Sequence, residues 1–395
     1  MSSLAPPAVF LAAAALFLVA LKARFGFLQQ LWGKPAPAKA SPLPVKAAEE
    51  PLRLPDPEPW LDFDLETAEV RDHLIVNKTV RYPYFQTMAH QNMHPNHWIE
   101  VDRHYRRDLE YKRQVIEEHP DRTVLSLPEN DAACGELLEL LVDYLPKRYP
   151  TLFEALPDGG IYNKVTDERF PDAGKLDGVP ALKVASRLVQ DDFLMAHPRE
   201  DGHFYMTGGL VAIPGFYDLR EKVNKSMFNI HVPVPQFNEK LLMSVERTLH
   251  RLKPHQPIER SSWEIVDDMK SHHHNIADLD PDNGDKVSAD LHPKDLIFRI
   301  DHQTFRKLPR SGAVIFAVRP VLRPLHTFAD LPLIPALLAT VHEKAPADLM
   351  KYKMAPCYQD RMLPYLKELT QSQIDRGLIK GDEDVSTFRD LVAKA

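Results

Sequence analysis

The chain of 395 residues carries 49 lysine and arginine residues against 56 aspartate and glutamate residues, a formal charge of −7. Hydrophobic residues make up 44% and charged residues 27%, which excludes a largely disordered, collagen-like or polytopic membrane chain. The negative balance points to no polyanionic partner, so we expect no binding to nucleic acid. Cys134 and Cys357 are the only cysteines, too few for a disulfide scaffold or a thiolate zinc site, and they suit a reducing compartment.

The N-terminal segment predicts a membrane anchor. Residues 4–21 contain no charged side chain, and residues 8–21 contain no polar one, which approaches the length of a membrane-spanning helix. Basic residues follow this apolar run and none precedes it, so the order is wrong for a secretory signal peptide and places the body in the cytosol. We therefore expect a single-pass anchor with a basic flank over residues 1–34, with the endoplasmic reticulum as the leading expectation. The alternative is a cleaved or mitochondrial targeting segment.

The next segment predicts a spacer, followed by one globular body. Residues 35–59 contain eight prolines among alanine, lysine and glutamate, a composition that stays extended. Over residues 60–395 the order of helical and strand patterns is irregular, which favours an α+β fold around an antiparallel sheet over a doubly wound parallel one. The expected helices cover residues 97–118 (with Asn96 as the cap), 137–145 (ending at Pro146), 241–252 and part of 370–395; the expected strands cover residues 204–213, 227–234, 295–305 and 313–321.

Most of the eighteen histidines suggest no metal site. Residues 272–274 precede a polar, turn-rich stretch and predict a solvated loop, and His94 and His97 lie at a helix entrance without a cysteine or third ligand. His231 in FNIHVPVPQF differs, because two prolines hold the backbone extended just beyond it. A fixed backbone would direct the imidazole, as a metal or haem ligand requires. The alternative is a structural histidine hydrogen-bonded to the backbone.

A second group of candidate residues lies in DLIFRIDHQTFRKLPRSGAVIFAV. On a strand, Arg299 and Asp301 project from one face and His302 from the other. The functional interpretation is that the ion pair orients a polar substrate while His302 donates or accepts a proton; the structural one is an edge ion pair and a core histidine. Arg306 and Arg310 belong to a basic turn that either binds carboxylates, such as haem propionates, or is solvated.

One further pair of carboxylates suggests a third hypothesis, a hydrolase site. Asp191 and Asp192 are adjacent, so on a strand their side chains face opposite ways. This geometry favours one of them as a structural hydrogen-bond acceptor.

Several segments together carry a resemblance. Between Arg81 and Tyr365 the sequence resembles the haem-dependent oxidative N-demethylase α-subunit-like family, in particular a fungal-looking, membrane-anchored branch. The resemblance implies a PAS-like core that binds haem b through a histidine. It also implies oxidation of an N-methyl amine with O2, with electrons from flavin, iron–sulfur and nicotinamide (NADPH) partners. The segments are YFQTMAHQNMHPNHWIEVDRHY, RLVQDDFLMAHP, FNIHVPVPQFNEKLLMSVERTL, ERSSWEIVDD, DHQTFRKLPRSGAVIF and LMKYKMAPCY.

Carried over residue by residue, the resemblance makes His231 the axial ligand. A family strand that reads Glu-Arg-Gln before Thr is Asp301-His302-Gln303 here, and an MGL-like triplet is Met88-Ala89-His90. These departures leave the substrate open.

The leading hypothesis is a membrane-tethered haem oxidoreductase that acts on a small amine. In it Asp301 pairs with the substrate cation, His302 relays protons, and Arg299, Arg306 and Arg310 contact the cofactor. Its electrons come from a separate reductase, because two cysteines cannot ligate an iron–sulfur cluster that needs four. The competing hypothesis is a catalytically silent protein that binds haem or another apolar ligand as a sensor or scaffold.

Overall fold

The computed structural model describes residues 53–76, 79–269 and 272–392. These residues all belong to one compact unit, Pro51–Ala395. The expected anchor and most of the expected spacer therefore lie outside the described residues, and residues 53–59 have no regular secondary structure. None of the helices in the described ranges combines the length and the apolar character that a membrane crossing requires.

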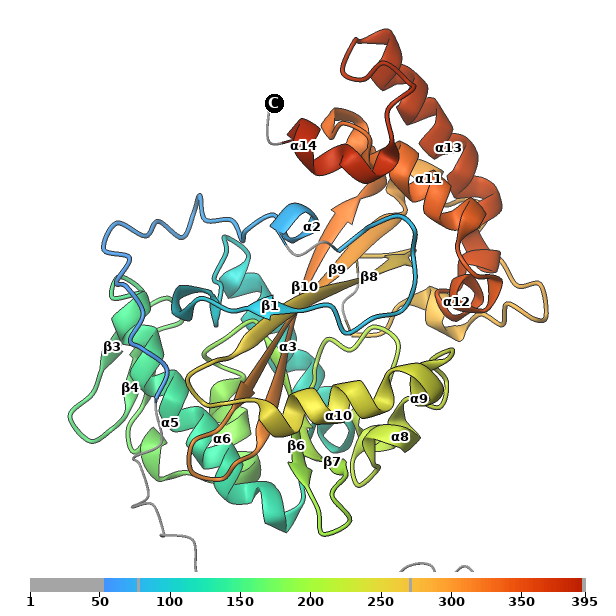
Figure 1. Ribbon diagram of the computed structural model, residues 1–395. Coiled ribbons are helices and arrows are strands. Elements are labelled where there is room, and N and C mark those ends of the chain that lie inside the picture. Colours follow the sequence, from blue (N-terminus) through green and yellow to red (C-terminus); the bar gives the residue numbers. More distant parts are fainter. Residues whose placement is uncertain (1–52, 77–78, 270–271, 393–395) are drawn as a thin grey trace, which may run out of the picture. The chain divides into compact units, whose positions relative to one another are not determined.

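An antiparallel sheet of seven strands forms the centre of the body, in the order β1-β8-β9-β10-β6-β7-β2 (Figure 1). The register of β9 and β10 pairs Phe305 with Phe316 and His302 with Arg319, so these side chains share faces of the sheet. The strands are β1 (Gln91–Asn92), β2 (Val124–Ser126), β6 (Asp192–Pro198), β7 (Phe204–Leu210), β8 (Ile258–Val266), β9 (Ile297–Lys307) and β10 (Val314–Pro324); a separate small sheet holds β3 (Phe153–Ala155), β4 (Ile161–Asn163) and β5 (Glu168–Phe170).

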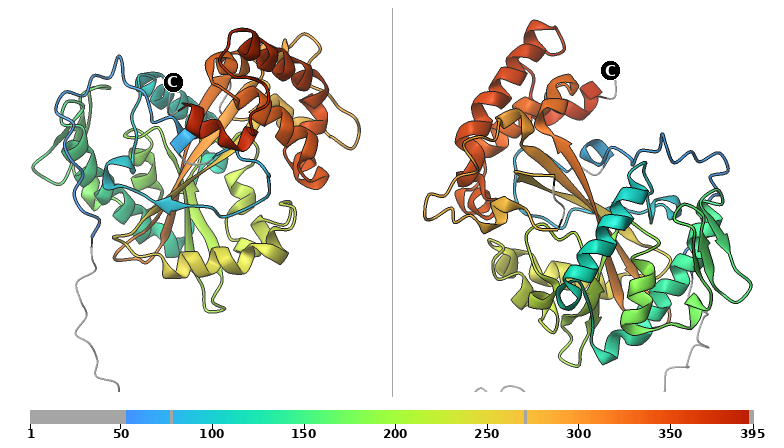
Figure 2. Two further views of the ribbon diagram at one scale, coloured as in Figure 1. Left: turned by 45° about the horizontal axis from the view of Figure 1, so that its top comes forward. Right: turned by 180° about the vertical axis from the view of Figure 1, so that it is seen from behind.

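One face of the central sheet packs against a helical layer that includes α3 and α5 (Figure 2, right). Met195, Ile315 and Ala317 project from the strands into this layer and are almost fully buried. The layer also contains the apolar side of α5, including Leu137 and Leu141. Its helices are α3 (Tyr105–Glu118), α4 (Pro120–Thr123), α5 (Asp131–Arg148) and α6 (Gly178–Ala185).

The opposite face of the sheet lies under a layer of short helices. Ala196, Phe305 and Val314 alternate with the side chains of the first face and cluster with Val245 and Leu249 of α10. The layer consists of α7 (Leu219–Lys222), α8 (Met227–Ile230), α9 (Phe237–Lys240) and α10 (Leu242–Arg251).

A third group of helices surrounds the far ends of β8, β9 and β10 (Figures 1 and 2). Phe298 packs there on Phe328 and Trp263 in a separate apolar cluster. The helices are α11 (Ile334–Lys344), α12 (Ala347–Tyr352), α13 (Ala355–Asp375) and α14 (Phe388–Val392), and α2 (His73–Val76) contributes to the same apolar cluster.

Short 3-10 helices connect the elements of the body. They are η1 (Pro95–His97), η2 (Pro128–Asn130), η3 (Ala173–Lys175), η4 (Asn275–Asp278), η5 (Pro293–Asp295), η6 (Leu325–Asp330) and η7 (Val385–Thr387).

The predicted α+β class with an antiparallel sheet is confirmed, but several boundaries differ. The first helix starts at Tyr105 rather than residue 97, because Trp98 and Ile99 pass through the core before it begins; His94, not Asn96, caps the preceding 3-10 turn. The second runs through Pro146 to Arg148, since a proline in the last turn removes only one helical hydrogen bond.

The strand predicted over residues 227–234 is wrong. Ser226 caps α8 instead, and its hydroxyl accepts a hydrogen bond from the Asn229 amide at 3.3 Å. Pro233 and Pro235 lack the amide hydrogens that a sheet ladder requires, so the chain turns rather than pairs.

Candidate functional site

A cavity of about 340 Å³ lies between the sheet and the helices α8–α10. This volume is within the usual range for small-molecule sites. Because alternate strand residues share a face, one side of β6, β7, β9 and β10 supplies a continuous apolar wall. The segment 79–89, which precedes β1, lines another part of the cavity. The apolar wall consists of Leu194, Ala196, Met206, Phe305, Val314 and Phe316.

His231 lines this cavity from the end of α8. Its ring stacks on Phe237 with the centroids 3.9 Å apart, and its Nδ1 lies 2.8 Å from the Met227 carbonyl oxygen. A carbonyl only accepts hydrogen bonds, so Nδ1 carries the proton and Nε2 keeps its lone pair. Burial lowers the pKa of His231 to about 4, which leaves the imidazole neutral at pH 7. This is the tautomer and charge that a metal-ligating histidine requires.

Two arginines bring positive charge to the cavity. The guanidinium of Arg81 donates to the Phe85 carbonyl at 2.9 Å and that of Arg260 to the Thr87 carbonyl at 3.2 Å. Neither forms an ion pair with a carboxylate of the described residues, and the Nε atoms of both are buried there without a hydrogen-bond partner. Burial lowers the pKa of Arg260 to about 10, so it stays cationic at pH 7. Partly buried cations without an acidic partner suit an anionic ligand.

Polar residues also line the part of the cavity near α12. Lys353 donates to the Trp263 carbonyl at 2.6 Å, and its Nζ lies 3.4 Å from Oε1 of Glu264. Burial raises the pKa of Glu264. Burial also raises the pKa of the Tyr217 hydroxyl, and the negative charges of Asp192 and Asp301 raise the pKa of Tyr217 further. Tyr217 therefore stays a hydrogen-bond donor at neutral pH.

The ion pair predicted between Arg299 and Asp301 is present, with 2.9 Å between Nε and Oδ1. Arg299 is buried and also donates to the Ile213 carbonyl at 2.9 Å, so it does not line the cavity. Asp301 shares a strand face with Gln303 and Phe305, which do line it. His302 projects from the opposite face, where its Nε2 lies 2.9 Å from Oε2 of Glu259. The structure therefore does not bring Asp301 and His302 together at one site.

The basic turn predicted to bind a cofactor lies elsewhere. Arg306 stacks over the Trp98 ring at 4.1 Å on the other side of the sheet, and Arg310 forms an ion pair of 2.7 Å with Glu139 of α5. The cations that line the cavity were missed by the sequence reasoning: Arg81, Lys222, Arg260 and Lys353. The one available signal was the alternation of Arg260, Ser262 and Glu264 in ERSSWEIV, which marks a polar face of a strand.

The other histidine and carboxylate predictions have mixed outcomes. His274 is fully buried, so the solvated loop is wrong at this position. Its two ring nitrogens have polar partners there: Nδ1 lies 3.2 Å from Oδ1 of Asp268, and Nε2 lies 3.0 Å from Nη1 of Arg299. Asp192 is confirmed as a structural acceptor, since the Ile213 amide donates to it at 2.6 Å. The nearby Lys112 lies 3.3 Å from the same carboxylate.

Residues 89–363 match the sequence model of a family described as haem-dependent oxidative N-demethylase, alpha subunit-like. The matched range covers more than half of the chain and contains His231, Arg260 and Asp301. A neutral imidazole in an apolar cavity, beside two arginines without acidic partners, fits an iron porphyrin with its two carboxylates. The chain therefore belongs to the haem-dependent oxidative N-demethylase, alpha subunit-like family.

Proposed function

We propose that the protein is a haem-dependent oxidoreductase that removes a methyl group from an N-methyl amine. The observation that carries this proposal is the state of His231, whose Nδ1–H is bonded to the Met227 carbonyl while Nε2 stays available inside the cavity. The bound group would be haem b. The antiparallel sheet with a cavity over one face supports a PAS-like description of the core.

The residues of the cavity have separate roles in this proposal. His231 would hold the iron, and Arg81 and Arg260 would neutralise the propionates. Tyr217, which lines the cavity, would donate a hydrogen bond to a bound group. Asp301 is not itself among the lining residues, but it is held by Arg299 on the same strand face as Gln303, which lines the cavity, and it would attract the ammonium group of the substrate. The bound haem would supply oxygen activation. The overall reaction converts the N-methyl amine, O2, two electrons and two protons into the demethylated amine, formaldehyde and water.

The electrons would come from a separate reductase that contains flavin and iron–sulfur groups and uses NADPH. Both cysteines are buried, one in α5 and one in α13, so they cannot share a cluster with outside ligands. A membrane anchor over residues 1–34 would hold the body at the cytosolic surface, in the endoplasmic reticulum as the leading choice. It would place the body beside a membrane-bound reductase.

The ligand assignment is tested by visible absorption spectra of the full chain, of His231→Ala and of the control His250→Ala, all produced with added haem. His250 is an exposed histidine of α10, in the same layer as α8. We expect haem absorption in the parent and the control and its loss in His231→Ala. Arg260→Met should weaken haem binding about tenfold or more, because one charge-assisted contact is lost. A parent that folds but takes up no haem, or a His231→Ala protein with an unchanged spectrum, would refute the assignment.

One observation favours the second candidate, a silent haem or apolar-ligand protein that acts as a sensor or scaffold. The Asp301 carboxylate already forms an ion pair with Arg299, and His302 lies on the opposite face of the sheet, where it contacts Glu259. Neither side chain is therefore positioned to bind a substrate in the cavity. The two functions differ in turnover. With a suitable reductase, an enzyme releases formaldehyde from an N-methyl amine and loses this activity in Asp301→Asn with haem retained. A sensor binds haem and releases none.

A further inference from the structure

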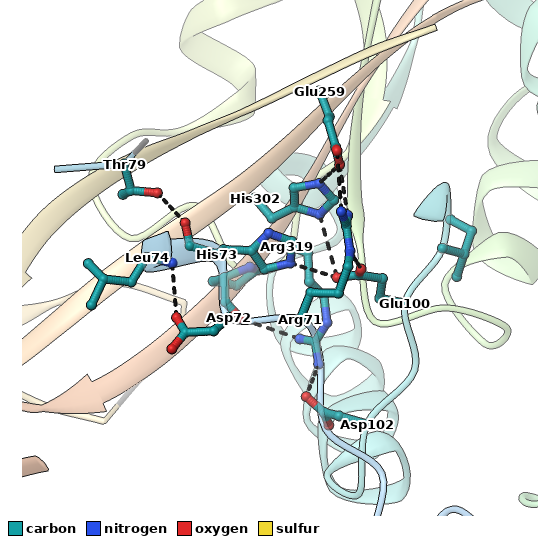
Figure 3. A network of polar contacts seen from close by, with 12 residues as sticks. Arg71, Asp72, His73, Leu74, Thr79, Glu100, Asp102, Glu259, His302 and Arg319 are labelled. Atoms are coloured by element: carbon teal, nitrogen blue, oxygen red, sulfur yellow. Dashed lines mark hydrogen bonds and ion pairs between the residues drawn. The ribbon is translucent and has the colours of Figure 1, made fainter. Parts of the chain in front are cut away.

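A cluster of buried ligand-type side chains lies on the other face of the sheet, away from the haem cavity. It consists of His73 at the start of α2, Glu100 in the segment before α3, and His302 in β9 (Figure 3). One donor atom from each lies within 4.8 Å of the other two, and all three residues are buried. Among the described residues, no other three histidine, cysteine or acidic side chains come together in this way.

The contacts inside the cluster fix which atoms face one another. Nε2 of His73 lies 2.6 Å from Oε2 of Glu100, and Nδ1 of His302 lies 4.0 Å from the same oxygen. On the other side of its ring, His302 Nε2 donates to Oε2 of Glu259 at 2.9 Å. The Nδ1 lone pair of His302 is therefore directed toward Glu100.

The surroundings resemble those of a metal centre in two respects. Metal-binding histidines commonly donate their second ring N–H to a carboxylate, as His302 does to Glu259. Arg71 bonds to both Glu100 and Glu259 and holds the two carboxylates in place (Figure 3). The two buried carboxylates thus share one permanent cation, Arg71, so a further positive charge would balance the second negative charge.

The cluster also has an access route. Arg71 and His73 line a polar cavity of about 790 Å³ that lies between α3 and the ends of β9 and β10. An ion could enter through this cavity, and water from it could complete the coordination. Two histidines and one carboxylate with an open position are a ligand set of zinc and of non-haem iron(II).

We propose that His73 Nε2, His302 Nδ1 and Glu100 bind one divalent transition-metal ion, with zinc as the probe. The rings of His73 and His302 are stacked, with the centroids 4.0 Å apart and an interplanar angle of 16°. Parallel rings cannot both point at one ion, so binding requires one of the rings to turn out of the stack. This site is separate from the proposed haem site and does not depend on it.

The test uses the full chain, freed of metal with a chelator and then dialysed against zinc, with bound zinc counted by mass spectrometry. We expect one zinc per chain in the parent and at least a tenfold weaker affinity in Glu100→Gln and His302→Asn. The matched control is His274→Asn, which alters another fully buried histidine that contacts a carboxylate, Asp268, outside the cluster. This control and His231→Ala should both keep the zinc.

A folding defect is separated from lost ligation by two further readouts. Zinc should raise the unfolding temperature of the parent and of His274→Asn but not that of His302→Asn. It should also shift the imidazole NMR signals of His73 and His302, because the stack opens. The proposal is overturned if the folded parent retains no zinc, or if its zinc affinity is unchanged in Glu100→Gln and His302→Asn.

Discussion

At the scale of single residues, the body buries charged side chains between α3 and the sheet. Lys112 is fully buried and its Nζ lies 3.3 Å from Oδ1 of Asp192, and Arg319 is buried with an ion pair of 2.7 Å to Asp102. Asp191 lies among these groups, but its Oδ2 has no hydrogen-bond partner in the described part of the chain. Burial therefore outweighs the attraction of Arg319 and Lys112 and raises the pKa of Asp191 to about 7.

This shift predicts how Asp191 affects stability with pH. Between the unfolded pKa of about 4 and the folded pKa of about 7, the folded chain holds a proton that the unfolded chain has lost. The free energy of unfolding should fall as pH rises through this window, by at most about 1.4 kcal/mol per pH unit from this group. Asp191→Asn removes the titration, so its stability relative to the parent should improve with pH. Urea unfolding of both proteins from pH 5 to 8 measures the difference, and parallel curves would contradict the assignment.

The sequence predicted individual residues best where a single element determines their environment. Strand periodicity alone predicts that Asp301 and His302 lie on opposite faces of the sheet, and the structure confirms this. His73 and Glu100 could not be linked to His302 in this way, because their contact joins three elements far apart in the chain. The same is true of Arg81 and Arg260, whose lack of acidic partners becomes visible only when the cavity is assembled.

At the scale of elements, strand periodicity was reliable over long runs and failed where a short-range cap and prolines opposed it. The strands expected over residues 295–305 and 313–321 appear as β9 and β10, because long runs of alternating apolar residues have few other ways to bury one face. The segment around His231 has similar apolar residues but forms α8 and a turn, since a serine cap and two prolines outweigh the alternation. His231 therefore lines the cavity from the end of a short helix and not from the expected strand.

The edge of the sheet offers a test of close backbone packing. Gly208 in β7 pairs with Ser126 in β2, and a Cβ atom at Gly208 would lie 2.6 Å from the carbonyl oxygen of Leu125. Nδ2 of Asn130 would lie equally close, at 2.6 Å, but the Leu125 oxygen belongs to the backbone, so β2 and β7 must separate. Gly208→Ala should lower the free energy of unfolding by about 1–3 kcal/mol, as overpacking does. Gly174→Ala, whose Cβ would lie 3.3 Å from its nearest neighbour, serves as the control. Equal stability of the two variants in thermal unfolding would show that the β2–β7 edge adapts freely.

At the scale of the whole molecule, one sheet separates two chemical environments. The face under α8–α10 carries the apolar cavity with His231, and the face under α3 carries the buried network of Glu100, Glu259 and His302. Long antiparallel strands make this possible, because alternate residues of β9 serve one face and then the other. The two proposed sites should consequently be separable by mutation: His231→Ala should lose haem and keep zinc, and His302→Asn should do the reverse.

The proposed anchor is the remaining question at this scale, and it concerns residues outside the described body. Residues 8–21 are without polar side chains, and the basic residues that follow them predict a cytosolic body. In cells that express tagged proteins, the full chain should sediment with membranes and resist extraction by carbonate. Residues 53–395 should stay in the supernatant with the same haem spectrum. Replacement of Leu16 and Leu18 by arginine should release the full chain, since charges at the centre of the run oppose insertion. A full chain that is found in the soluble fraction, or cleaved after the apolar run, would instead support the targeting-segment alternative.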